Sequence, residues 1–429
     1  MNDPHESLLS LIRFVRERSP FYQHAYRDLP ATVTSLEQVP VIAQDEFWEA
    51  NTLDNNRLLT GPMEDGLILK SGGTTGKPKF SVFSRDEWSE FTQTFALKLA
   101  QCGLRKGDRV ANLFYVGDLY GSFIFTHKVL EECPIRVLQL PISGITPISS
   151  VLKTIQEYGV TVIAGLPTTV MTLLDEIERI PGKSRTQVRS ILFAGEPMQP
   201  DLRERVLRIF PGAEIRSIGY ASNDAGLLGY ADLSCGPNEF RCYDGEAIYE
   251  ILDEATGNPI VQAGQEGRAV VTALKRSLMP VIRYPVGDRA KWLDPEGTAD
   301  RKFLLLGRSE ESARIASLTL PFDEVHSVLQ AFSDRLGSFQ FQLIVVHEDA
   351  RDGLIIRIAS RVTAADRAAC ERDLIAAFYA FRPIYRQFVD AGKVHPVRID
   401  WSPPATLETN TRTGKLKRVI DLRLKPPAP

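Results

Sequence analysis

Residues 71–80, SGGTTGKPKF, bring together residue types that bind phosphate. Glycines let backbone N–H groups approach an anion, hydroxyl groups add donors, and lysines add positive charge. The P-loop of NTPases, however, has four residues between its glycines, followed by Lys and then Ser or Thr. Here Gly72 and Gly76 enclose three residues, and Pro78 follows Lys77, so the spacing argues against a Walker-type NTPase.

The residues on either side of this glycine-rich loop predict a β-hairpin. GLILK (66–70) and KFSVFS (79–84) both alternate as strands do. A helix is expected to begin at Ser84, because Glu87 completes a capping box there. A loop between two such strands is either a phosphate-binding turn or an ordinary glycine-rich turn. The loop by itself leaves both interpretations open.

Size and composition limit the classes of protein to consider. A chain of 429 residues predicts two or more domains. An apolar content of 43% and a charged content of 24% are typical of a globular protein with an ample core. A net charge of -3 offers no basic face for nucleic acid. Five scattered cysteines indicate reduced thiols, and neither a signal peptide nor a membrane-spanning run is visible. We therefore expect a cytoplasmic protein without nucleic-acid or membrane partners.

The pattern of elements predicts the fold class. Strand-like and helix-like segments alternate between residues 109 and 220, which is typical of βαβ units and parallel sheets. Short strands with glycine turns follow at residues 246–293 and predict a small β-rich subdomain. After residue 308 a second mixture of helices and strands predicts a small α+β domain. The expected fold is a large α/β N-terminal domain with a small α+β C-terminal domain.

Residues 71–79 resemble the phosphate loop of the acyl-adenylate-forming superfamily, which contains the acyl-CoA synthetases and the nonribosomal peptide adenylation domains. Further segments resemble the superfamily in the same order: AGEP (194–197), SIGYASNDAG (217–226), MPVIRYPVGDRA (279–290), LLGRSEE (305–311) and TRTGKLKRVID (411–421). The short chain and the strings RERSPFYQHAY, VPVIAQDEF and GKLKRVID are similar to the phenylacetate–CoA ligase-like branch. The resemblance implies an adenylation domain over residues 1–308 and a mobile lid domain over residues 309–429.

The implied reaction is attack of a carboxylate on the α-phosphate of ATP, which gives acyl-AMP and pyrophosphate with Mg²⁺ as cofactor. The acid is expected to be aromatic, and CoA is the family's default acceptor. The alternatives are transfer of the acyl group to an amine, a carrier protein or a reductase, or a catalytically silent protein that still binds the nucleotide. A homodimer is common among such relatives.

The resemblance also assigns the nucleotide-binding residues: Ser71, Gly72, Gly73, Thr74, Thr75, Gly76, Lys77, Gly195, Glu196, Pro197, Tyr220, Ala221, Ser222, Asn223, Asp288 and Arg308. In this assignment Tyr220 stacks on adenine and Asp288 accepts hydrogen bonds from the ribose hydroxyls. Arg308 contacts the ribose or a phosphate. Asn223 replaces the usual Thr or Ser.

The catalytic residues in this assignment are Lys415 and Asp224. The Lys415 ammonium group bridges the substrate carboxylate and the α-phosphate, which reduces the repulsion between two anions. Asp224 stands where the family has a magnesium-binding glutamate, so the charge is kept on a shorter side chain. Glu310 is the acid at the hinge.

Residues 115–123, YVGDLYGSF, lie where the family places residues of the acid pocket. Tyr115, Tyr120, Gly121 and Phe123, together with Gly165, would suit a flat aromatic acid. An aromatic stripe of this kind is also typical of ordinary core, and both interpretations stay open.

The chain departs from the family pattern at two places. Relatives often carry a zinc site after the adenine motif, but here Arg241 replaces the expected histidine beside Cys235, so no zinc is expected. After the hinge, CoA-using relatives usually have a glycine followed by a basic or polar residue, where this chain has Ser317 and Thr319. The side chain of Ser317 narrows the expected pantetheine tunnel, which keeps acceptors other than CoA open.

Overall fold

The computed structural model describes residues 4–70, 79–180, 186–198, 200–308, 312–336, 339–360, 362–403, 406–408 and 416–424. Contacts within the chain divide it into two compact units, Met1–Leu305 and Leu306–Pro429. The boundary falls inside strand β14 (Lys302–Arg308), whereas the sequence analysis placed it after Arg308. Within the described residues, no helix is both long and apolar enough to cross a membrane.

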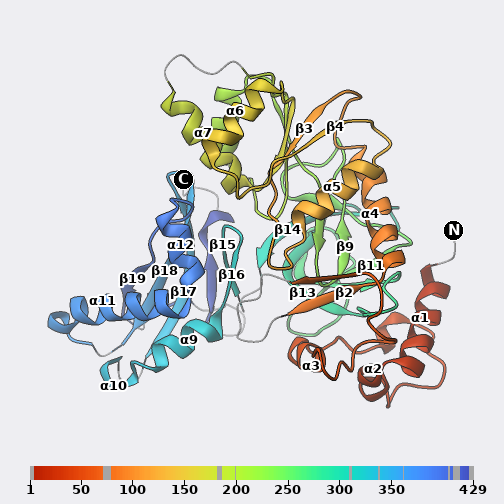
Figure 1. Ribbon diagram of the computed structural model, residues 1–429. Helices are drawn as coiled ribbons and strands as arrows, with labels where there is room; N and C mark the ends of the chain where they lie inside the picture. The colour runs from red at the N-terminus through yellow and green to blue at the C-terminus, as the bar shows by residue number, and fades with distance from the viewer. Residues whose placement is uncertain are drawn as a thin grey trace. The chain divides into compact units, whose positions relative to one another are not determined.

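The first unit opens with short helices that cover one end of its β-rich part (Figure 1). They are α1 (Pro4–Arg18), α2 (Pro20–Ala25), η1 (Leu36–Gln38) and α3 (Gln44–Ala50). Apolar side chains at helical spacing in α1 are buried, including Leu8, Ile12 and Val15. The hydroxyl group of Tyr22 donates to the carbonyl of Pro280 at 2.9 Å, which ties these helices to the chain just before β13 (Tyr284–Trp292).

The hairpin predicted around the glycine-rich loop is confirmed. Strands β1 (Leu67–Lys70) and β2 (Phe80–Phe83) pair antiparallel. Helix α4 (Arg85–Leu99) follows with the capping box formed by Ser84 and Glu87. Glu87 has a second role that the sequence did not predict, because its Oε1 accepts hydrogen bonds from the backbone N–H groups of Ser277 at 2.6 Å and Leu278 at 2.7 Å.

A five-stranded parallel sheet forms the α/β part of this unit, in the order β4-β3-β5-β6-β7. The strands are β3 (Arg109–Asn112), β4 (Leu138–Pro141), β5 (Val162–Gly165), β6 (Ser190–Phe193) and β7 (Glu214–Ser217). The connecting helices are α5 (Ser122–Glu132), α6 (Ile148–Glu157), α7 (Pro167–Arg179) and α8 (Pro200–Ile209). The chain runs from β3 to β4 in one direction and from β4 on to β7 in the other. Right-handed connections therefore place α5 on one face and α6 to α8 on the other, as Figure 1 shows for α5, α6 and α7.

The expected β-rich part is antiparallel and larger than the sequence indicated. Its five-stranded sheet has the order β10-β14-β13-β12-β11, with β10 (Glu239–Arg241), β11 (Ala247–Leu252) and β12 (Glu266–Ala273). A separate hairpin is formed by β8 (Tyr220–Ser222) and β9 (Gly226–Gly229). Together with the parallel sheet, these antiparallel sheets give the expected α/β domain with a β-rich part.

The second unit has an α+β fold with its own core, as predicted. A four-stranded sheet of order β19-β18-β17-β20 contains β17 (Gln340–Glu348), β18 (Arg351–Ala359), β19 (Arg398–Trp401) and β20 (Val419–Asp421). The helices are α9 (Phe322–Gln330), α10 (Ser333–Leu336), α11 (Ala364–Phe381), α12 (Pro383–Asp390) and η3 (Leu422–Leu424). A small hairpin, β15 (Ser312–Ile315) and β16 (Leu318–Pro321), packs on this sheet.

Candidate nucleotide and acid site

The carboxyl ends of the parallel strands meet at one edge of the sheet in the first unit. The strand order changes direction between β3 and β5, and open α/β sheets bind ligands in the crevice at such a point. The chain leaves β3 through Leu113, whose N–H donates to the carbonyl of Ala164 at 2.7 Å. Gly165, which ends β5, lies so close to Leu113 that an added Cβ would be 3.2 Å from the Leu113 Cβ. Gly165 is therefore at the expected crevice.

The predicted acid-pocket residues fall on the loop that follows β3 and on the start of α5. The Tyr115 hydroxyl accepts a hydrogen bond from Thr169 in α7 at 3.5 Å, so this side chain spans the crevice between β3 and β5. Phe123 lies in the first turn of α5, a helix that the sequence analysis missed, and both Tyr115 and Phe123 pack against the core of the unit. Gly121 packs against β1, since an added Cβ would be 2.7 Å from Leu69 Cδ2. Tyr120 lies in the same loop, with its N–H bonded to the carbonyl of Gly117 at 2.9 Å.

Lys70, the last residue before the glycine-rich loop, connects three segments of the site. Its N–H donates to the carbonyl of Leu119 at 2.9 Å. Its carbonyl accepts from the Asn223 side chain at 2.9 Å. Its ammonium group pairs with Asp118 at 3.0 Å. The strand that enters the loop is therefore fixed both to the acid-pocket loop and to the hairpin that carries the adenine motif. Residues 71–77 themselves lie outside the described residues, and their phosphate contacts stay a prediction.

The β8–β9 hairpin carries the adenine motif, with Asn223 and Asp224 in the turn between its strands. The Tyr220 hydroxyl donates to Asp288 Oδ2, which brings together the residues predicted to contact adenine and ribose. Asp288 is only 6% exposed. The Tyr220 ring centroid lies 5.5 Å from that of Phe240, and the Ser222 hydroxyl accepts from the N–H of Ala225 at 3.0 Å.

The AGEP segment (194–197), which follows β6, is held in place by the carboxylate of Glu196. Both carboxylate oxygens of Glu196 accept hydrogen bonds from Thr168 at the start of α7, at 2.9 Å from the N–H and 3.0 Å from the hydroxyl. Gly195 has a φ of +82°, which favours glycine, and Pro197 follows Glu196 in the same segment. The Glu196 side chain thus connects two strand ends, a structural use that the sequence analysis did not predict.

Among the described residues, the carboxylate that the resemblance assigns to Mg²⁺ is Asp224, whose Oδ2 lies 3.5 Å from the Tyr284 hydroxyl. No group of three or more His, Cys, Asp or Glu among the described residues could hold a metal ion by itself. Mg²⁺ is commonly bound by one or two carboxylates together with substrate phosphates. A single carboxylate beside the entry to the glycine-rich loop fits that arrangement.

The side chains of three further predicted site residues lie outside the described part of the chain: Arg308, Glu310 and Lys415. Arg308 ends strand β14, and its side chain is outside the described part of the chain. Glu310 and Lys415 lie outside the described residues as well. Their assigned roles at the hinge, the ribose and the reacting carboxylate stay predictions.

Arg241, which replaces the histidine of the zinc-containing relatives, connects several segments. Its guanidinium group donates to Asp232 at 2.9 Å, to the Ser234 hydroxyl at 3.0 Å and to the carbonyl of Asp300 at 3.4 Å. It also lies 3.6 Å from Asp294. Within the described part of the chain, this cation pairs with Asp232 and Asp294 at the place where tetrahedral zinc would need a further ligand beside Cys235. The residues present do not fit a zinc site.

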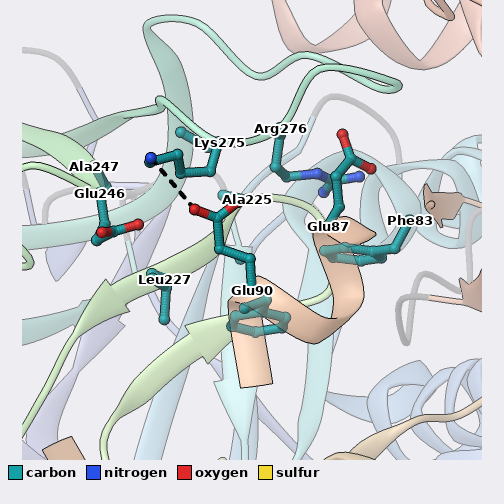
Figure 2. A pocket seen from close by; sticks show the side chains of 12 residues that line it. Phe83, Glu87, Glu90, Ala225, Leu227, Glu246, Ala247, Lys275 and Arg276 are labelled. Carbon is teal, nitrogen blue, oxygen red and sulfur yellow. Dashed lines mark ion pairs between the residues drawn. The ribbon is translucent and has the colours of Figure 1, made fainter. Parts of the chain in front are cut away.

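Sequence reasoning also missed Arg276, which lies between β12 and β13 and is 4% exposed. Figure 2 shows this side chain beside Glu87 and over the ring of Phe83, with the guanidinium carbon 3.9 Å from the ring centroid. Its hydrogen-bond partners are backbone carbonyl groups, which leave no trace in a sequence motif.

Residues 28–273 match the family described as AMP-binding enzymes, and they make up more than half of the chain. The protein therefore belongs to that family. It is an adenylate-forming ligase of the phenylacetate–CoA ligase-like branch, as the sequence motifs implied.

Two curated relatives and one solved structure illustrate the similarity. The phenylacetate-coenzyme A ligase of Thermus thermophilus is 25% identical over 448 residues, which cover 97% of this chain and 95% of the relative. That of Aromatoleum evansii is 25% identical over 434 residues, covering 98% and 94%. A crystal structure of 2-hydroxyisobutyryl-CoA ligase with 2-HIB-AMP and CoA superposes with a TM-score of 0.69 at 20% identity, covering 97% of this chain and 88% of that one. This structure supports the fold.

Proposed function

We propose that this protein activates a small carboxylic acid with ATP, forming acyl-AMP and pyrophosphate, and then transfers the acyl group to CoA. The observation that carries the proposal is the pair of contacts made by the β8–β9 hairpin. Asn223 holds the strand that enters the glycine-rich loop, and Tyr220 holds Asp288. The strand that enters the glycine-rich loop and the residues assigned to adenine and ribose thus belong to one connected set in a chain of the AMP-binding family.

In this proposal the residues assigned to the site position the nucleotide and the acid before the reaction. The Tyr220 ring stacks on adenine while its hydroxyl orients the Asp288 carboxylate toward the ribose. Donors in residues 71–77 bind the phosphates, and Asp224 holds Mg²⁺, which when bound supplies positive charge to the phosphate oxygens. Lys415 brings the substrate carboxylate to the α-phosphate. Because both reactants are anions, donors and cations placed in advance lower the barrier most.

An aromatic acid is the substrate class that we propose. Tyr115 and Gly165 lie at the crevice between β3 and β5, where a ring could rest against the tyrosine above a residue without a side chain. The similarity to phenylacetate-coenzyme A ligases over nearly the whole chain supports the same class.

CoA is the proposed acceptor because the two curated relatives named above are CoA ligases, and the similarity covers 95% and 94% of their lengths. Ser317, which raised doubt about CoA, lies with Ala316 in the two-residue turn between β15 and β16. The positive φ in this turn, +51°, belongs to Ala316. A glycine at position 317 is therefore not required by the backbone of this hairpin.

The direct test is product analysis. The protein is incubated with ATP, Mg²⁺ and a panel of aryl, heteroaryl and aliphatic acids, with and without CoA, and acyl-AMP, AMP and thioester are measured by mass spectrometry. We expect acyl-AMP without CoA and an aryl thioester with it. Acyl-AMP that gives no thioester, but an amide with an amine or a loaded carrier protein, would select the alternative acceptor. If no AMP is formed with any acid, the result would favour the alternative of a catalytically silent protein that binds the nucleotide.

The setting of the reaction is part of the same proposal. We infer a cytoplasmic location, where ATP and CoA are available, and a homodimer as the assembly to test by light scattering. Binding of nucleic acid or membranes is not expected from the composition.

A further inference from the structure

The β8–β9 turn (residues 223–225) is fastened on two sides. On one side Asn223 donates to the carbonyl of Lys70, the last residue of β1, at 2.9 Å. On the other side Arg276 donates to the carbonyl of Asp224 and lies 3.5 Å from the carbonyl of Asn223. The same guanidinium group donates to the carbonyl of Val82 in β2 at 2.7 Å. Strands β1 and β2 are the two strands that flank the glycine-rich loop.

Several contacts fix Arg276 itself. Its guanidinium carbon is 3.9 Å from the centroid of the Phe83 ring, a cation–π geometry. The next residue, Ser277, donates its N–H to Glu87 Oε1 at 2.6 Å, so the backbone beside Arg276 is held by the N-terminus of α4. Burial lowers the pKa of Arg276 to about 10, partly offset by the charges of Glu87 and Asp224. The side chain remains a cation at neutral pH despite being buried.

We infer that Arg276 is a positioning residue for adenylation, which sets the place of the Asp224 carboxylate relative to the glycine-rich loop by holding the β8–β9 turn to β2. The inference rests on the proposed function, because Asp224 is the proposed magnesium ligand. Arg276 does not touch the substrate itself. Through Arg276 and Asn223, each strand of the loop hairpin is connected to the same turn, so Asp224 keeps a fixed position relative to the two strands that flank the glycine-rich loop.

Bridging the β8–β9 turn and strand β2 requires a planar, forked donor such as a guanidinium group. The guanidinium group presents several N–H donors in fixed directions, so it can reach carbonyl groups on two separate segments at once. A lysine carries the same charge on a single nitrogen and can satisfy one segment while leaving the other loose. Arg276→Lys therefore keeps the charge and removes the bridge between the turn and β2.

The test compares Arg276→Lys with wild type in acid-dependent ATP–pyrophosphate exchange at varied Mg²⁺ and ATP. A misplacement of about 1 Å can cost about 10²-fold in rate. We expect kcat/KM for MgATP to fall by about 10²-fold, and more Mg²⁺ to be needed for half-maximal rate, while the KM for the acid changes little. A purely structural role would lower the melting temperature and leave these two magnesium-dependent readouts unchanged, which would overturn the inference.

Arg189→Lys is the matched control. Arg189 likewise joins two segments, the Asp108 carboxylate and the backbone carbonyl of Gly103 at 3.2 Å, but it precedes β6 and so lies at the amino ends of the parallel strands, away from the proposed site. This control is expected to lose stability without any change in magnesium dependence. An equal change in both variants would contradict the assignment to Arg276.

Two further variants keep the inference testable if Arg276→Lys does not fold. Phe83→Leu removes the ring beneath the guanidinium group while leaving Arg276 in place, and a milder form of the same magnesium phenotype is expected.

Asn223→Ala combined with Arg276→Lys, or with Phe83→Leu, gives a double-mutant cycle. Because both contacts hold one turn, the losses should be non-additive, and additive losses would contradict the shared role. Wild-type protein without exchange on any acid would instead reject the proposed function itself.

Discussion

Tyr220 shows how one side chain at this site serves two contacts. Its ring lies beside Phe240 and is assigned to adenine, while its hydroxyl donates to the buried carboxylate of Asp288, which is assigned to the ribose. The hydrogen bond to a charged acceptor orients Asp288 before the nucleotide arrives. The two contacts can be separated by substitution, because phenylalanine keeps the ring and loses the hydroxyl.

Tyr220→Phe is predicted to weaken ATP binding more than it weakens the fold. A hydrogen bond to a charged group contributes about 1.5–3 kcal/mol, so the KM for ATP in pyrophosphate exchange should rise by about tenfold. Tyr230→Phe is the matched control, because the Tyr230 hydroxyl donates to Asp300 at 2.6 Å in a part of the unit not assigned to the nucleotide. Equal KM values for ATP in the two variants would argue that the Tyr220 hydroxyl has only a structural role.

Residues of the site differed in how far the sequence predicted them. Two contiguous sequence motifs, residues 217–226 and 279–290, predicted four residues of the site, because the order of residues in each motif matches the family: Tyr220, Asn223, Asp224 and Asp288. Arg276 was missed because its partners are carbonyl groups of Val82, Asn223 and Asp224, and every residue supplies a carbonyl. The side-chain use of Glu196 was missed for a related reason, since its partner Thr168 belongs to a different strand end.

At the scale of elements, the alternating strands and helices of the parallel sheet were predicted, whereas helices α5 and α12 were missed. The parallel strands and helices α6 to α8 follow the expected alternation, and the hairpin around the glycine-rich loop pairs as predicted. Helix α5 was missed because it begins at Ser122 after the N-cap residue Gly121, which provides no side-chain cap. Helix α12 follows α11 directly, with Pro383 at its first position.

The hydrogen bonds of Arg241 are predicted to stabilise the fold in the place where relatives have a zinc site. Arg241→Met removes hydrogen bonds to Asp232, Ser234 and the carbonyl of Asp300, and should lower the free energy of unfolding by about 1–3 kcal/mol. Arg398→Met is the control, because its ion pair with Glu348 is largely exposed and should contribute less than about 1 kcal/mol. Both values are measured by urea unfolding.

The same segments should not respond to zinc. The melting temperature of wild type is expected to be the same with EDTA and with added zinc, because Arg241 occupies the place of a ligand. A rise in melting temperature at one equivalent of zinc, lost on chelation, would contradict this reading.

The second unit contains a buried carboxylate that predicts a pH dependence. Asp352 is 7% exposed and accepts from His347 at 2.7 Å, from the N–H of Ala316 at 2.8 Å and from Arg423 at 2.5 Å. Burial alone would raise the pKa of Asp352, but the hydrogen bond from His347 and the charge of Arg423 outweigh it, so the pKa lies below its usual value. Ionised Asp352 therefore stabilises this unit and the turn at Ala316.

The sign of the effect follows from the lowered pKa. The stabilisation is complete above the unfolded pKa of about 3.9 and is lost as the pH falls through the folded value. Asp352→Asn should therefore unfold more easily than wild type at pH 7, and the difference should shrink below about pH 4. Chemical unfolding from pH 3 to 7 measures this difference. A difference that stays constant over that range would mean that the carboxylate charge is not what stabilises the unit.

At the scale of the whole molecule, the chain has two compact units with separate cores. The first contains the residues assigned to the acid and all those assigned to the nucleotide except Arg308. The second contains Arg308 and Lys415, and the resemblance assigns Lys415 to the chemistry. This division of roles between the units is a prediction from the order of the sequence motifs along the chain. The hinge at Glu310 and the movement of the lid domain stay predictions, since neither is a property of the described residues.

The most direct test of the account is acid-dependent ATP–pyrophosphate exchange by wild type, Lys415→Ala and Lys417→Ala. Lys417 is a close control, because it stands two positions away and pairs with Glu408 at 3.4 Å. The account predicts exchange with at least one aromatic acid, a loss of about 10²–10³-fold in Lys415→Ala and almost none in Lys417→Ala. Exchange that is absent with every acid, or that is unchanged in Lys415→Ala, would contradict it.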